Sequence, residues 1–260
     1  TEAKSHPVFA AMEATGAGRA ARSGLGYGAV FAIFLLTLLL AGQTVGMMAE
    51  EKSNKVIEIL AAALPLESVF FGKLLGMLGV ALLFVLFWAI MIAGGSLLLT
   101  SQMPQVTATY AALTPAIGWP LFIILGIVYF LAAFLLLGAV FLGIGAQAST
   151  VREIQMLSMP ITFLQVGMFA LSSAAANAPG SRLATIAQIL PWSSPFAMAA
   201  RGASDGALWP HLAALAWQAL WIAITIWLSV RVFRAGVLRS SSGGWWPFGR
   251  KSRVKAPLDS

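Results

Sequence analysis

The sequence predicts an all-α integral membrane protein with five transmembrane helices, and three observations support this class. Hydrophobic residues make up 59% of the 260 residues and charged residues only 10%, which lies outside the usual composition of soluble domains. The apolar residues gather in five long runs, each long enough to cross about 30 Å of hydrocarbon as a helix. Apart from His211 at the start of the last run, these runs contain no charged residue.

The five runs are each too long for an ordinary buried strand or core helix, so we expect a membrane crossing at every one. Together they define a transmembrane domain at 24–239, with crossings at 27–48, 74–100, 119–147, 157–175 and 211–230. The sequence has no cysteine and so offers neither a disulfide nor a thiolate metal site. Its net charge of +7 does not indicate nucleic-acid binding, because the basic residues lie beside the apolar runs, where topology and anionic lipid account for them.

Basic residues also predict the orientation in the membrane. With the amino terminus outside, eleven of the 16 Lys and Arg residues fall in the inner segments and only five in the outer ones. We therefore expect segment 1–23 to be the end of an extracytoplasmic segment and the carboxyl terminus to be cytoplasmic. The cytoplasmic tail, 240–260, carries two Trp and several basic residues, which would suit anionic lipid; a merely solvated tail is the alternative.

The start of the chain raises the question of how the amino terminus reaches the outside. Segment 1–23 has no apolar core of signal type, and the first residue is Thr1 rather than Met. We expect the chain to be a fragment of a longer protein that has an upstream crossing. A processed start is the alternative, and it leaves the topology unchanged.

Segment 49–73, which we call the elbow, carries seven charges between two uncharged runs. From Asn54 onward its apolar residues follow helical spacing and predict an amphipathic helix at the membrane surface. The face of this helix consists of Val56, Leu60, Ala63 and Leu64. Pro65 has no N–H to donate and so ends the run of helical backbone hydrogen bonds. We expect a second short helix to run from there to Lys73. The mixed charge and the length of the elbow indicate a docking surface for a soluble partner.

Three motifs carry a family resemblance. EEKSNKVIEIL in the elbow, followed by a proline and then GKLLG, resembles the cytoplasmic loop of type-2 ATP-binding-cassette (ABC) exporter permeases, in particular the branch related to sodium-efflux permeases. TVREIQMLSMP, at 150–160, resembles the inner loop before the fifth crossing of that family, and ILPWSSPFAMAAR, at 189–201, the outer segment before the last. The family has six crossings and a large extracytoplasmic domain after the first. The chain resembles the portion from the end of that domain onward.

The resemblance implies a permease subunit of an ATP-driven exporter in a bacterial-type inner membrane, paired with a second permease subunit and with ABC ATPase subunits. The elbow would be the coupling helix that docks on the ATPase. The residues assigned to coupling are Glu51, Lys52, Glu58, Leu60, Pro65, Lys73, Arg152 and Gln155. For Arg152 and Gln155, a plain loop that obeys the positive-inside rule is the alternative. ATP would bind to the partner, because this chain has no G-x-x-x-x-G-K-[ST] motif, and we expect no cofactor here.

Other function classes have less support. The sequence has no H-E-x-x-H or G-x-S-x-G motif and no pair of carboxylates within a crossing, so we expect no catalytic site. We expect His211 to be an interfacial residue. An ATP-independent carrier or channel remains an alternative, although carriers usually place ionisable residues inside the bilayer. A non-transporting membrane scaffold is a third. The residues do not decide the cargo, which could be Na⁺, a drug or a lipid-like molecule.

Two further patterns concern packing. Leu183, Ile186, Ala187 and Leu190 follow helical spacing and predict a helix on the outer leaflet, with a gate on the exit path as the alternative. Small residues allow membrane helices to approach closely. We therefore expect tight contacts within the subunit, with a dedicated dimer motif as the alternative, at Gly42, Gly46, Gly72, Gly76, Gly138, Gly143 and Gly145.

Overall fold

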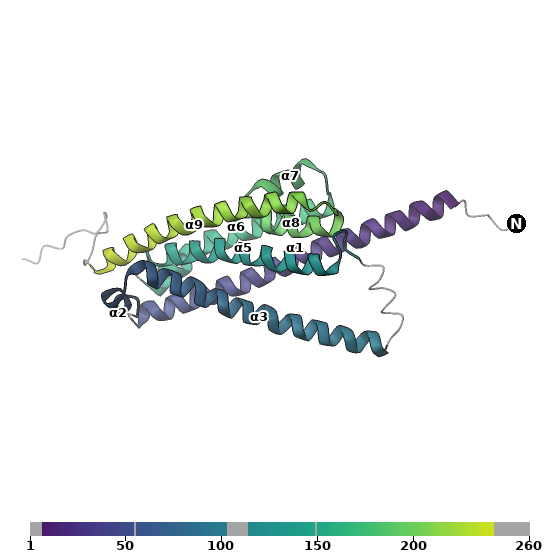
Figure 1. The fold of residues 1–260 in the computed structure, drawn as a ribbon. Coiled ribbons are helices and arrows are strands. Elements are labelled where there is room, and N and C mark those ends of the chain that lie inside the picture. Colours follow the sequence, from purple (N-terminus) through teal and green to yellow (C-terminus); the bar gives the residue numbers. More distant parts are fainter. Residues whose placement is uncertain (1–6, 55, 103–113, 149, 242–260) are drawn as a thin grey trace, which may run out of the picture.

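The computed structural model describes residues 7–54, 56–102, 114–148 and 150–241, and within these ranges it is helical and contains no strand. The helices are α1 (Pro7–Ser53), α2 (Val56–Ala63), α3 (Leu66–Gln102), α5 (Trp119–Gly145), α6 (Val151–Asn177), α7 (Arg182–Ile189), α8 (Ser194–Ser204) and α9 (Trp209–Ser241). They form an elongated bundle with α2 at one end and α7 at the other (Figure 1). Five of them, α1, α3, α5, α6 and α9, are long and apolar enough to cross a membrane. The predicted all-α fold with five crossings is confirmed.

The long helices run further than the apolar runs that predict them, with the exception of α5, which ends two residues earlier at Gly145. Helix α6 begins at Val151 because Thr150 caps it: the Thr150 Oγ1 accepts a hydrogen bond from the backbone N–H of Glu153 at 3.2 Å. The motif at 150–160 is therefore a cap and the first turns of a helix, not a loop. Helix α5 begins after Gly118, whose φ of 80° is a left-handed conformation that favours glycine.

Helix α5 lies at the centre of the bundle. In the apolar stretch of α5, 44% of the residues are buried, whereas the same measure is 11% for α3. Helix α5 packs against α1, α3, α6, α8 and α9. Helix α3 packs on the bundle near its first turns and then diverges from it (Figure 1). Most of the apolar surface of α3 therefore faces away from the other described helices.

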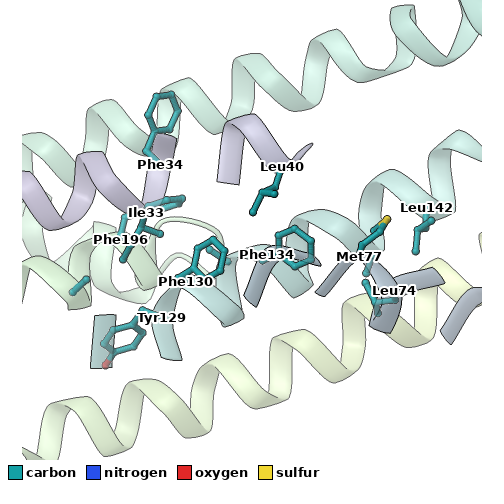
Figure 2. Packing of buried hydrophobic residues seen from close by; sticks show 14 of the residues in the cluster. Ile33, Phe34, Leu40, Leu74, Met77, Tyr129, Phe130, Phe134, Leu142 and Phe196 are labelled. Atoms are coloured by element: carbon teal, nitrogen blue, oxygen red, sulfur yellow. The ribbon is translucent and has the colours of Figure 1, made fainter. Parts of the chain in front are cut away.

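The largest cluster of buried hydrophobic residues lies around α5 (Figure 2), and two small clusters lie beside it. The buried side chains of the largest cluster include Ile33, Phe34 and Leu40 of α1, Leu74 and Met77 of α3, Tyr129, Phe130, Phe134 and Leu142 of α5, and Phe196 of α8. Aromatic rings add contacts between helices distant in sequence, such as Phe34 stacked on Phe169 with centroids 4.3 Å apart. Among membrane helices, such dispersion contacts replace the hydrophobic driving force that operates in water.

The glycine prediction is confirmed at the elbow end of α5, and at the other four glycines no tight contact with another described helix is present. A Cβ on Gly143 would lie 3.2 Å from the Cα of Ser229, so α5 and α9 nearly touch there. Gly138 and Gly145 are similarly crowded by side chains of α3 and α1. The four glycines that have no such neighbour within 4 Å among the described residues are Gly42, Gly46, Gly72 and Gly76. Their spacing in the sequence suits close helix contact, but the helix faces that carry them do not contact another described helix.

The two ends of the bundle bear on two further predictions. The second short helix expected after Pro65 is instead the first two turns of α3, which continues unbroken to Gln102; a proline just before a helix removes no hydrogen bond of that helix. The predicted outer helix is present as α7, with Ala184 and Ala187 buried and Leu183 and Ile186 exposed, and its place on the outer leaflet stays a prediction. The following helix, α8, was not predicted, and nearly all of it is buried against α1, α5 and α6.

The close approach of α9 to the backbone at the end of α5 generates a test. A Cβ on Gly236 of α9 would lie 2.6 Å from the carbonyl oxygen of Ala146, so Gly236→Ala forces a backbone shift. We expect this substitution to lower stability by about 1–3 kcal/mol. Gly79→Ala on α3 is the matched control, since no atom of the described part of the chain outside its own helix backbone lies within 4 Å of a Cβ placed there. Thermal unfolding in detergent checks both, and equal unfolding temperatures for the two variants would contradict the packing described here.

Candidate functional site

The elbow is built from three helices separated by two tight breaks. Helix α1 continues to Ser53, α2 occupies Val56–Ala63, and α3 starts at Leu66. The N–H of Asn54 still donates to the carbonyl of Glu50 at 3.0 Å, and the N–H of Leu64 to the carbonyl of Leu60 at 2.9 Å. Helical backbone hydrogen bonds therefore continue one residue past the end of α1 and one residue past the end of α2. This leaves α2 as a short, compact element at the elbow end of the bundle (Figure 1).

Two of the charges assigned to coupling bind each other. Lys73 of α3 donates to Glu51 at the end of α1, and their side chains are only 10% and 21% exposed. The pair closes the elbow by joining the helices on either side of α2. Their assignment to a partner surface came from the family resemblance and the charge pattern of the elbow, and the sequence does not show that two charges 22 residues apart meet.

A second ion pair joins the elbow to the last helix. Arg234 of α9 donates to Glu67 in the first turn of α3 at 2.8 Å, and both side chains are more than half exposed. The two residues are 167 positions apart, so no local sequence signal could indicate the contact. The last turns of α9 also bring Phe233 onto Phe70 of α3, with ring centroids 5.6 Å apart. Helix α9 is therefore part of the elbow end.

Helix α2 has an inner and an outer side. Val56 and Leu60 are half-buried, and Leu60 packs against the core, as expected for an amphipathic helix. Ala63, predicted on the same face, is exposed, and so is Leu64, directly after the helix. Ile59 is 67% exposed, and Leu64 is 50% exposed. Two large apolar side chains therefore point away from the bundle at this end.

The remaining predicted site residues divide into two groups. Lys52 and Glu58 belong to α1 and α2, but their side chains lie outside the described residues. Arg152 and Gln155 lie in the first turns of α6, where both are exposed. Helix α6 starts at the elbow end because it follows the end of α5, and it packs along α1. Pro65 is exposed between α2 and α3.

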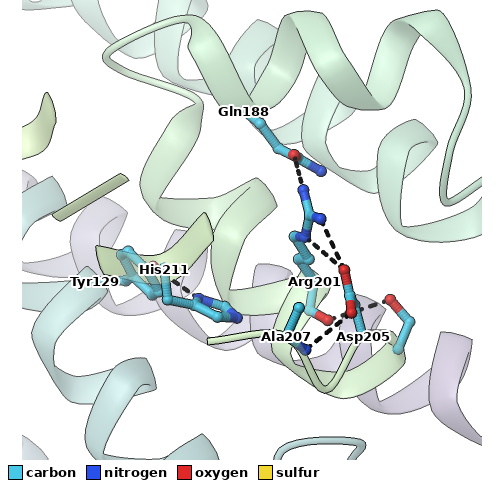
Figure 3. A network of polar contacts seen from close by, with 7 residues as sticks. Tyr129, Gln188, Arg201, Asp205, Ala207 and His211 are labelled. Carbon is cyan, nitrogen blue, oxygen red and sulfur yellow. Dashed lines mark hydrogen bonds and ion pairs between the residues drawn. The ribbon is translucent and has the colours of Figure 1, made fainter. Parts of the chain in front are cut away.

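The opposite end holds a polar network that sequence reasoning missed (Figure 3). Arg201 of α8 donates to Asp205 Oδ2 from Nε at 3.0 Å and from Nη2 at 2.7 Å, and to Gln188 of α7 at 2.8 Å. Asp205 also accepts the backbone N–H of Ala207 at 3.0 Å. The Ala207 N–H and the Arg201 guanidinium hold the pKa of Asp205 below its usual range. The network fixes α7, α8 and the turn before α9.

His211 is a buried residue, and its place at the membrane interface stays a prediction. Its side chain is 2% exposed, and its Nδ1 is 2.9 Å from the hydroxyl of Tyr129 on α5 (Figure 3). The physical reason is that α9 packs against α5 from its first turn, so Tyr129 supplies a polar partner. Among the described residues, no group of three or more His, Asp or Glu side chains gathers in a way that suits a metal ion.

The comparisons with known proteins agree with these features. A family model described as an ABC-2 family transporter protein matches residues 3–231. The uncharacterized protein YhaP of Bacillus subtilis (strain 168) is 28% identical over 220 residues, which cover 83% of this chain and 51% of YhaP. The uncharacterized protein MJ1024 of Methanocaldococcus jannaschii is 25% identical over 213 residues, 81% of this chain and 49% of MJ1024. The chain thus spans about half the length of these curated relatives. No solved structure matches.

The buried ion pair of the elbow makes a first prediction here. Glu51→Gln leaves Lys73 without its counter-charge, and we expect a loss of about 1–3 kcal/mol, less than for fully buried pairs because Glu51 keeps some exposure. The exchange of both residues, Glu51→Lys with Lys73→Glu, should recover most of it. Glu67→Gln is the control: it breaks an exposed pair and should cost less than about 1 kcal/mol. Thermal unfolding of the purified variants measures these differences. A swap no better than the single change would argue against the pair.

The Asp205 network makes a second prediction, on pH dependence. A carboxyl with a lowered pKa in the folded protein stabilises the fold above its unfolded pKa, about 3.9 for Asp, and this contribution is lost as the pH falls through the folded value. Acidification below about pH 4 should therefore destabilise the wild type through this group. In Asp205→Asn, stability at pH 7 should be lower and the acid-induced loss smaller. Unfolding temperatures of both proteins across acidic pH test this, and parallel curves would refute it.

Proposed function

Because the chain belongs to the ABC-2 transporter family, we propose that it is the membrane part of a permease subunit in an ATP-driven exporter. Hydrolysis of ATP would take place in a separate ABC ATPase subunit, and this chain would bind no cofactor of its own. A second permease subunit would complete the pathway. The multi-pass arrangement of apolar helices suits this role. Export as the direction of transport follows from the resemblance of the elbow, 49–73, to exporter permeases.

The observation that carries the proposal is the two-sided arrangement of α2. On its inner side, Val56 and Leu60 hold it against the bundle, and α2 contacts α1, α3 and α9. On its outer side, Ile59 and Leu64 are left exposed at the end of the molecule. An apolar side chain surrounded by charged residues suits the central contact of a protein interface. A partner that grips this side would act on three membrane helices at once.

The ion pairs of the elbow support transmission of that movement. Glu51 and Lys73 join α1 to α3, and Glu67 and Arg234 join α3 to α9. With its flanks tied in this way, α2 would move with the ends of these helices as one body when the partner closes. We therefore reassign Glu51 and Lys73 from partner contact to transmission within the subunit. Contact with the ATPase is left to the exposed side of α2.

The other predicted coupling residues keep their proposed role at the same end. Lys52 and Glu58 flank the exposed apolar side chains in sequence, and Arg152 and Gln155 are exposed at the start of α6. This mixture of charged residues around an apolar centre would form the rim of the interface. The proposal places the elbow and the carboxyl terminus in the cytoplasm of a bacterial-type cell, with the basic tail beside the lipid of the inner membrane.

The decisive experiment is affinity capture of the full-length protein in mild detergent, with mass spectrometry of what co-purifies. We expect a subunit that carries a G-x-x-x-x-G-K-[ST] phosphate loop. Ile59→Ala should weaken its binding about tenfold, because truncation of an apolar residue at an interface centre costs on the order of 1–2 kcal/mol. The matched control is Ile186→Ala on α7, an exposed isoleucine at the opposite end.

The outcomes separate the proposal from its rivals. Weakened capture with Ile59→Ala and normal capture with Ile186→Ala supports coupling through α2. Equal capture for both variants removes α2 from the interface. If no subunit with a phosphate loop co-purifies with the wild type even after cross-linking in membranes, the chain works without an ATPase, as the carrier and scaffold alternatives require.

A further inference from the structure

The last long helix, α9, changes character at Arg231. From Pro210 to Val230 it contains no Asp, Glu, Lys or Arg. At 1.5 Å per residue, the stretch from Trp209 to Arg231 is about 33 Å long, close to the hydrocarbon thickness of about 30 Å. Arg231 therefore lies where α9 leaves the hydrocarbon, at the elbow end of the bundle.

The side of α9 that carries Arg231 faces away from the other described helices. Ile224, Trp227 and Leu228 are 41%, 55% and 54% exposed, and Arg231 is exposed as well. These positions recur at helical spacing and form one stripe, whereas the side that carries Phe233 is buried. In a bilayer, an apolar stripe of this kind lies against acyl chains, and the charge at its end lies near the headgroups.

The guanidinium of Arg231 lies over the indole ring of Trp227, with the Cζ 3.7 Å from the ring centroid. Residues four apart are neighbours on a helix surface, and an arginine over the face of a tryptophan gains a cation–π interaction. Trp227 lies about one turn deeper in the apolar stretch. An arginine at this boundary ordinarily extends toward water, but Arg231 turns back toward the hydrocarbon. Trp227 thus fixes a positive charge at the level where lipid headgroups meet acyl chains.

The charge of Arg231 is not neutralised within the described part of the chain. No carboxylate there forms an ion pair with Arg231. Arg234, in the next turn, is paired with Glu67 at 2.8 Å, so the charges of that pair cancel. A guanidinium has five N–H donors at its edge, and contact through its face with a ring leaves that edge available. The site therefore presents hydrogen-bond donors and one net positive charge to the surrounding lipid.

The anion that fits this position is the phosphate of a phospholipid. The planar fork of arginine matches the spacing of phosphate oxygens. A free phosphate ion would contact Arg231 alone, whereas a phospholipid also buries its acyl chains along Ile224 and Leu228. A zwitterionic headgroup would bring a second cation beside Arg231 and Arg234, and like charges repel. The charge of the site therefore favours a lipid whose headgroup is negative overall.

We propose that Trp227 and Arg231 form a binding site for an anionic phospholipid. Its phosphate accepts hydrogen bonds from the Arg231 guanidinium, and its acyl chains lie along Ile224 and Leu228. The site is one turn from the pair of Arg234 and Glu67 that joins α9 to α3, so the bound lipid stabilises this end of α9 beside the elbow. The site involves no ATPase, and it stands or falls independently of the exporter function.

The test is native mass spectrometry of the full-length protein in a neutral detergent, which resolves each bound lipid. The protein is titrated with dioleoylphosphatidylglycerol, which is anionic, and with dioleoylphosphatidylethanolamine, which has no net charge. The wild type should bind the anionic lipid more tightly. Arg231→Gln should lower its affinity for the anionic lipid about fivefold, the effect of one basic residue near the membrane surface, and leave the other lipid nearly unchanged. Trp227→Leu, which removes the ring, should lower it about twofold to fivefold.

Arg152→Gln is the matched control. Arg152 is an exposed arginine at the same end, on α6, and no aromatic ring of the described residues lies under its guanidinium. This variant loses the same charge but keeps the site, so its affinity for phosphatidylglycerol should equal that of the wild type. Equal losses in Arg152→Gln and Arg231→Gln would mean general charge attraction and overturn the proposal.

Two further outcomes need no variant. A wild type that binds phosphatidylglycerol and phosphatidylethanolamine equally well also overturns the proposal. Inorganic phosphate in about hundredfold excess, at constant ionic strength, should leave the lipid in place, because the acyl chains contribute to its binding. Displacement of the lipid would make the occupant a free anion and would contradict a lipid site.

Discussion

The packing of α5 against its neighbours is the constraint on which the rest of the structure depends. Helix α5 contacts α1, α3, α6, α8 and α9, and no other long helix is as deeply buried in its apolar part. In hydrocarbon, helices gain little from leaving the surrounding lipid, so their association relies on close contact. Gly138, Gly143 and Gly145 allow that contact on the elbow half of α5. A gap of about 0.5–1 Å already removes a quarter to a half of the dispersion energy of a contact, so these positions matter for how closely the bundle packs.

The two ends of the bundle are built differently around this centre. At the elbow end, ion pairs join α1, α3 and α9 across the break that contains α2, so a push on α2 reaches several helices. At the opposite end, α8 is packed inside the bundle, and Arg201 holds it to α7 and to the following turn. The first arrangement suits an end that receives movement. The second suits an end that stays in place while the first moves.

Between the ends lies an interior in which, among the described residues, buried Thr, Ser, Gln and His side chains occur but no buried Asp, Glu, Lys or Arg. Tyr129 supports His211, and Thr37 supports Gln165. The Gln165 Oε1 has no hydrogen-bond partner among the described residues, and the same holds for the Gln218 Oε1 and the hydroxyls of Ser173 and Ser194. The same interior gives no support to a site for a bare cation.

The sequence by itself determined that this is a five-crossing helical membrane protein, because the length and apolarity of a run decide whether it can cross a bilayer. It also indicated the family, through the local motif of the elbow. It could not show that Glu51 meets Lys73, that His211 is buried or that α8 enters the core. Those facts depend on which faces of distant helices come together, and a uniformly apolar helix carries almost no periodicity to indicate its inner face. Only the tertiary structure, by packing the helices around α5, decided which charges and amides find partners.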